Sequence, residues 1–216
     1  MLACFFKTSV CLRLAGITWL GLSVCTLSAT AAQKPVRQVA IHGEGIQPPE
    51  SLEELWDKSA VVVDGRVVDV RPSNQTVTPT VSLPAGGEVR PATLVATDYV
   101  IQVHRVLKAD DVVTTKVTTV VVRRFGGTID SGDYIAEMVD RHFAKFKPQG
   151  RYVLFLRRAN ATVASTPVYF PVVGPDSAFE LHGNQVLPLG RAGASRQLAK
   201  YGADQLVAAL ASKGGR

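Results

Sequence analysis

An Asp-Ser-Gly tripeptide at Asp130, Ser131 and Gly132 is the motif in this chain that points most directly to a reaction. An aspartate in this setting can act with its copy from a second chain, the two close carboxylates sharing one proton to activate water. Val172-Val173-Gly174 adds a second element of such sites. Asp133 follows where a small residue is expected, and a third carboxylate would perturb the proton sharing. We therefore expect a polar loop, and keep a dimeric aspartic-type hydrolase using Asp130 as an alternative.

Metal chemistry has little support in the sequence. Zinc sites need several converging ligands, often with spacings such as H-x-x-x-H, and no such pair occurs among His42, His104, His142 and His182. The segment 137–142 includes Asp140 and could place an acid near a base, but Arg141 and Lys145 favour a solvated charged loop. We predict no metal, no cofactor and no catalytic residue, and hence no enzyme.

The first 31 residues resemble a secretory signal peptide. Lys7 and Arg13 precede an apolar run over 14–27, and the small-x-small sequence Ala29-Thr30-Ala31 closes the segment. The apolar run is shorter than the roughly 20 residues of a membrane span, and no later run reaches that length. We expect cleavage between Ala31 and Ala32, a secreted or periplasmic protein, and no transmembrane helix once the leader is removed.

Leader removal would also take away every cysteine, since Cys4, Cys11 and Cys25 all lie within it. Lipidation of Cys25 stays open as an alternative, although Val24 is larger than the residue that usually precedes a lipidated cysteine. Without disulfides, the mature domain must rely on an apolar core. Its 22 basic and 18 acidic residues leave a net charge of +4, spread too evenly to predict nucleic-acid binding.

The mature chain is expected to be mainly β. Residues 51–58 predict a short helix, because Ser51 and Glu54 form a capping box ahead of Leu55 and Trp56. Alternation of apolar and polar residues then predicts strands, and a terminal helix follows near Ala203. The expected strands cover 61–70, 99–107, 116–124, 152–156 and 169–173, with a final hairpin around Gly183-Asn184.

Between these elements the sequence predicts irregular segments. Residues 32–50 are expected to be a flexible lead-in and 71–93 a long loop, because both are rich in Gly and Pro. Residues 128–147 are expected to be irregular or weakly helical, and Pro171 predicts an edge strand. The domain is expected to span 51–190, followed by a tail with a helix over 191–216.

The order of these segments resembles a group of exported bacterial domains whose barrels are similar to the OB-fold of netrin and tissue-inhibitor-of-metalloproteinases domains. The resemblance rests on Ser59 to Val67, Tyr99 to Lys108, Phe125-Gly126-Gly127 and Phe146 to Leu156. It implies a small OB-like β-barrel, closed or partly open, with a short N-terminal helix and a C-terminal helix. The animal inhibitors reach the protease metal through an N-terminal cysteine, which the mature chain lacks, so no functional residue carries over.

These observations favour an exported, non-catalytic binding or interaction module of the cell envelope. Its partner would be an extracytoplasmic protein or glycan, not a nucleic acid. Beside the hydrolase, inhibition of a protease through loops remains an alternative, because it would use the same fold without a cysteine.

Overall fold

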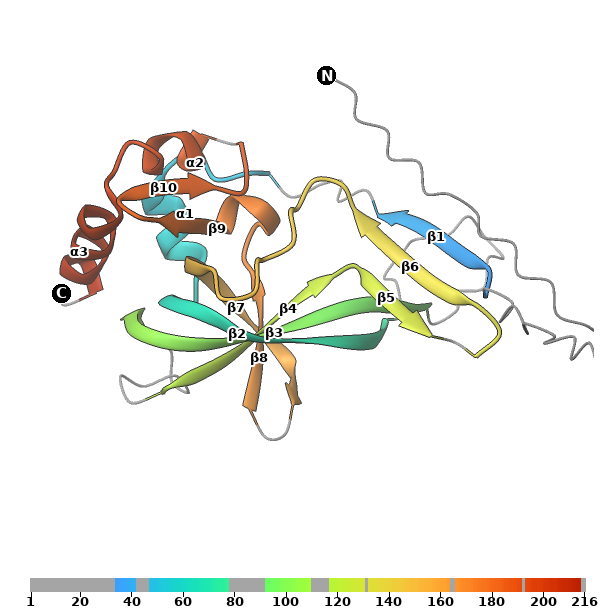
Figure 1. Ribbon diagram of the computed structural model, residues 1–216. Helices are drawn as coiled ribbons and strands as arrows, with labels where there is room; N and C mark the ends of the chain where they lie inside the picture. Colours follow the sequence, from blue (N-terminus) through green and yellow to red (C-terminus); the bar gives the residue numbers. More distant parts are fainter. Residues whose placement is uncertain are drawn as a thin grey trace, which may run out of the picture. The chain divides into compact units, whose positions relative to one another are not determined.

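The computed structural model describes residues 34–41, 47–77, 92–109, 117–130, 132–163, 166–191 and 193–214. They belong to one compact unit that begins at Lys34 (Figure 1). The expected signal peptide (1–31), all three cysteines, His42 and Ser131 lie outside the described residues.

The described chain is mainly β, as the sequence predicts, with three helices. The helices are α1 (Leu52–Lys58), α2 (Gly193–Leu198) and α3 (Ala203–Gly214), and a 3-10 turn, η1, spans Gly174–Ser177. The first five strands are β1 (Val36–Ile41), β2 (Val61–Val77), β3 (Ala92–Lys108), β4 (Thr119–Phe125) and β5 (Gly127–Asp130). The others are β6 (Ile135–Asp140), β7 (Arg151–Val163), β8 (Thr166–Pro171), β9 (Ala178–His182) and β10 (Gln185–Pro188).

Five strands pair in a closed circuit, in the order β7, β2, β3, β4, β8 and back to β7. The strand β7 makes this possible because it is long: one edge pairs with β2, while the other pairs first with β9 and then with β8. Since β8 has partners on both sides, the expectation of an edge strand at Pro171 is wrong. Pro171 is the last residue of β8, where a missing N–H interrupts the pairing least.

The apolar core has two main parts, one on each side of these strands. Val61 and Val63 point into a cluster that receives side chains from all five strands of the circuit and therefore fills its interior. Val62 points the other way, into a cluster formed with all three helices and β9. Figure 1 shows α1 and α2 gathered beside β9 and β10. The predicted tail over 191–216 is thus part of the domain core, to which Leu206 and Leu210 contribute.

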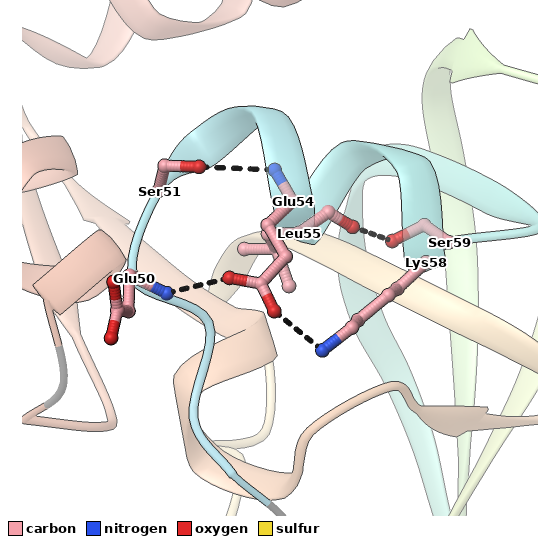
Figure 2. A network of polar contacts seen from close by, with 6 residues as sticks. All are labelled: Glu50, Ser51, Glu54, Leu55, Lys58 and Ser59. Atoms are coloured by element: carbon pink, nitrogen blue, oxygen red, sulfur yellow. Dashed lines mark hydrogen bonds and ion pairs between the residues drawn. The ribbon is translucent and has the colours of Figure 1, made fainter.

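The helix α1 begins and ends where the sequence predicts. The Ser51 hydroxyl accepts a hydrogen bond from the Glu54 amide at 3.2 Å, and the Glu54 carboxylate accepts from the backbone N–H of Glu50 at 2.9 Å and from Lys58 at 2.6 Å (Figure 2). The carboxylate reaches back one residue beyond the usual capping-box position. At the other end, the Ser59 hydroxyl donates to the Leu55 carbonyl.

Three irregular segments expected from the sequence contain strands instead. The lead-in over 32–50 contains β1, which pairs in parallel with β6, and the segment 128–147 contains the hairpin of β5 and β6. The ends of the expected loop 71–93 belong to β2 and β3, which pair as far as Val77 and Ala92. The strands β1 and β6 pair with each other across a long stretch of sequence, and the ends of β2 and β3 pair across the expected loop, while local Gly, Pro and charged residues hide them.

Gly126 and Gly127 follow β4 and redirect the chain from the five-strand circuit into the three-stranded sheet of β1, β6 and β5. Their φ angles of 105° and 136° are in a region that other residues rarely adopt. The pairing of β2 with β3 is irregular at Gly65, as expected of a glycine in the middle of a strand. In the part of the chain that the structure describes, no helix combines the length and apolar character needed to cross a membrane.

The N-cap of α1 gives a first test. Replacing Ser51 by Ala removes the acceptor for the Glu54 amide and is expected to lower the free energy of unfolding by about 1 kcal/mol. Ser212→Ala is the matched control, because this exposed serine in α3 only bonds back to the Ala209 carbonyl and should change stability by less than about 0.5 kcal/mol. Equal effects in urea denaturation would show that the cap does not stabilise the domain.

Candidate binding site

The buried cation Arg124 is the most unusual polar group in the described chain. It follows Val120 and Val122 along one face of β4, and these two valines point into the interior of the strand circuit. Because side chains on a strand alternate between faces, Arg124 continues this apolar face. Only 5% of the residue is exposed. A charged group therefore lies at one end of an apolar core.

Aromatic rings surround the guanidinium of Arg124. Its central carbon lies 3.9 Å from the ring centre of Phe143 and 5.7 Å from that of Phe146. Its Nη2 donates to the Phe143 carbonyl. The Nε, which is also buried, has no hydrogen-bond partner among the residues that the structure describes. One donor of this guanidinium is thus left unsatisfied in a place where that is costly.

Two other arginines of this protein have their charge neutralised by a carboxylate. Arg123 forms a two-pronged ion pair with Asp98 at 2.6 and 2.8 Å, and Arg151 forms one with Asp64 at 2.8 and 2.7 Å. Hydrogen bonding to these carboxylates raises the pKa of both arginines. Both pairs link neighbouring strands, so we interpret them as structural.

Arg124 behaves in the opposite way. Burial lowers the pKa of Arg124, and electrostatic attraction to Tyr99, a hydrogen bond with the Tyr99 side chain and attraction to Asp140 offset this only in part. Among the described residues, no carboxylate forms an ion pair with its guanidinium. The charged form is therefore held in a desolvated place without a matching anion, and an external anion placed there would be stabilised.

The segment 140–147 holds the aromatic rings over Arg124. The Asp140 carboxylate accepts from the backbone N–H groups of His142 and Phe143 at 2.9 and 3.2 Å, which forms a tight turn after β6. Further on, the Phe146 ring packs 4.9 Å from that of Tyr99 and 5.0 Å from that of Tyr152. The rings thus close one end of the interior and fix the surroundings of the guanidinium.

A cavity of about 310 Å³ opens beside Arg124, where β4, β6 and β8 end. Its aromatic wall is the stacked pair of Phe125 and Phe170, whose ring centres are 5.4 Å apart. Arg157 lies directly opposite Phe170 in the β7–β8 ladder, with its guanidinium 5.2 Å from the Phe170 ring centre. The other lining residues are Pro48, Arg123, Asp140, His142, Phe143, Pro171, Val173, Gly174, Pro175 and Asp176. A volume of this size is at the lower end of small-molecule sites.

Asp130, the candidate for hydrolysis, lies away from this cavity. Its side chain is 60% exposed and forms an ion pair with Lys34 at 2.7 Å, while its carboxylate also accepts from the Gly132 amide. The bond from Lys34 holds the pKa of Asp130 below its usual value. A proton-sharing pair needs one carboxylate that keeps its proton, so this surrounding gives the hydrolase alternative no support.

The three histidines that the structure describes are not brought together. His104 and His182 are exposed on β3 and at the end of β9, and only His142 lines the cavity. Among the described residues, no cluster of three or more His, Cys, Asp or Glu side chains is arranged to hold a metal ion. The acid and base considered for the segment 137–142 are replaced by a positioning role: Asp140 shapes the turn that covers Arg124.

Sequence reasoning missed Arg124, although a signal for it exists. From the sequence, both Arg123 and Arg124 are counted as surface charges. In the alternating pattern of the strand, however, Arg124 stands at the position where an apolar residue is expected after Val120 and Val122. Comparison of the chain with protein-family models, with curated proteins and with solved structures gave no match. The site therefore has to be interpreted from its own geometry.

The contrast between neighbouring arginines can be measured. Arg123→Met leaves the buried Asp98 carboxylate without its partner and is expected to lower the free energy of unfolding by about 3 to 5 kcal/mol. Arg124→Met replaces a poorly compensated cation by an apolar side chain of similar length and is expected to change stability by no more than about 1 kcal/mol. Urea denaturation of both variants checks this. If Arg124→Met were as damaging as Arg123→Met, Arg124 would be a structural residue.

Proposed function

We propose that this chain is an exported, non-catalytic binding module built on an OB-like barrel, and that its ligand places an anionic group against Arg124. The observation that carries the proposal is the buried guanidinium with an unsatisfied Nε and no carboxylate partner among the described residues. Residues that reduce stability without an evident structural gain are typical of functional sites. The closed circuit of five strand pairings supports the OB-like part, and the charged start and apolar run of the first 31 residues support export.

The same geometry favours binding over catalysis. Arginine keeps its proton at all ordinary pH values, so Arg124 serves to hold an anion and not to transfer a proton. Its rigid aromatic surroundings would keep the guanidinium in place before the ligand arrives, which reduces the cost of binding. An extracytoplasmic partner, as the leader suggests, would then be recognised through an acidic group small enough to enter the cavity.

The proposal predicts that small anions stabilise the purified protein in a manner that depends on Arg124. A ligand at 100 times its dissociation constant raises the free energy of unfolding by about 2.7 kcal/mol. We expect stabilisation by at least one of acetate, octanoate and phosphate, measured by urea denaturation at constant ionic strength, and its loss in Arg124→Met. Octanamide, which has no charge, should not stabilise.

Arg158→Gln is the matched control, because Arg158 is exposed on β7 and does not line the cavity. It removes one positive charge, as Arg124→Met does, and should leave anion stabilisation unchanged. Equal stabilisation of all three proteins would show that the anions act on the whole surface and would contradict the proposal. The absence of stabilisation in the wild-type protein would contradict it too.

A further inference from the structure

The charges that line the cavity restrict which anion fits beside Arg124. Arg124 and Arg157 contribute two positive charges, and Asp140 and Asp176 contribute two negative ones. Arg123 also lines the cavity, but an ion pair already neutralises its charge. The lining thus carries charges of both signs, so the first negative charge of a ligand can meet a guanidinium, while a second one would lie near a carboxylate. Polyanions such as phosphate are therefore disfavoured.

The two carboxylates of the lining are held in place by other bonds. Asp140 accepts from two backbone amides, and Asp176 accepts from the Ser195 hydroxyl at 2.7 Å. Ser195 is completely buried. These bonds fix the two carboxylates, so the carboxylates cannot turn away from a ligand. A second negative charge on the ligand would therefore be repelled.

The rest of the lining is apolar and would pack against an uncharged body. Phe125 and Phe170 form a stacked surface, and Pro171, Val173 and Pro175 continue it. The volume of about 310 Å³ is at the lower end of the range for small-molecule sites. It suits a small carboxylate, such as one on a chain or ring system of seven or eight carbons.

We propose that the cavity binds a small monocarboxylate with an apolar body, with its carboxylate at Arg124 and its body on the Phe125–Phe170 pair. This inference rests on the function proposed above and names the ligand class of the same site. Arg157 lies over Phe170 at the aromatic side of the cavity and adds a second positive charge to its lining. The ligand is then selected by one charge, one apolar surface and a limited length.

Calorimetric titration of the purified protein with octanoate, phenylacetate, acetate, phosphate and octanamide tests the ligand class. We expect one site per chain. Octanoate and phenylacetate should bind at least about tenfold more tightly than acetate, because each buried methylene adds roughly fourfold in affinity. They should also bind more tightly than phosphate and octanamide, which lack the body and the single charge, respectively.

Two arginines that are adjacent on β7 provide the matched variants. Arg157→Gln should weaken octanoate binding severalfold, since Arg157 lines the cavity, while Arg158→Gln should leave it unchanged. Both residues are exposed, so both variants are expected to fold. Equal losses in the two variants would place the ligand elsewhere and overturn the inference.

The outcomes separate this inference from the function on which it rests. If phosphate binds as tightly as octanoate, and Arg124→Met abolishes its binding, the site takes anions but the monocarboxylate class is wrong. If no anion binds in a way that depends on Arg124, the proposed function and the inference fall together. Tight octanoate binding that survives in Arg124→Met would show that the apolar body alone drives binding, and would also overturn the inference.

Discussion

The arrangement of the site depends on one interaction, the packing of the Arg124 guanidinium between the interior of the strand circuit and the aromatic rings of the segment 140–147. The guanidinium contacts the ring and the carbonyl of Phe143, in the segment that lies across one end of the core. They compensate the charge only in part, because a ring face and a neutral carbonyl attract a cation less strongly than a carboxylate does. The core is thereby closed by a group that still favours an anion.

The other buried charges show that this protein can satisfy an arginine when structure alone requires it. Asp98 and Asp64 are almost completely buried, and each receives two hydrogen bonds from an arginine on a neighbouring strand. Removing one partner of such a pair is costly, which keeps the strands in register. Arg124 is only one residue from Arg123 but points to the opposite face, so the same strand carries a structural arginine on one side and our candidate binding residue on the other.

The sequence predicts those parts of the fold that local pattern determines. The alternation from Tyr99 to Leu107 predicts a strand, and Ser51 with Glu54 predicts the start of a helix, because in both cases the decisive contacts lie within a few residues. The strands β1, β5 and β6 were not predicted. The strands β1 and β6 form by pairing between segments distant in sequence, such as Val36 with Ile135, which no local pattern reports. The strand β5 is the four-residue hairpin partner of β6.

The candidate site was less predictable than the fold. Arginine is rarely buried in proteins, so a pair of arginines is assigned to the surface unless a partner is known. The partners here are the rings of Phe143 and Phe146, in a segment that has no regular structure. The one sequence signal for burial is that Arg124 shares a strand face with Val120 and Val122. That signal is weak beside the general preference of arginine for water.

The most direct test of the account is the NMR signal of the Arg124 Nε–H group, assigned by its loss in Arg124→Met. Because this donor is buried and unsatisfied, its hydrogen should exchange slowly and lack the downfield shift of a strong hydrogen bond. Addition of octanoate is predicted to shift the signal, because the ligand carboxylate would lie against the guanidinium, while octanamide should leave it in place. A signal that stays unchanged at saturating octanoate would contradict the claim that Arg124 holds the anionic group of a ligand.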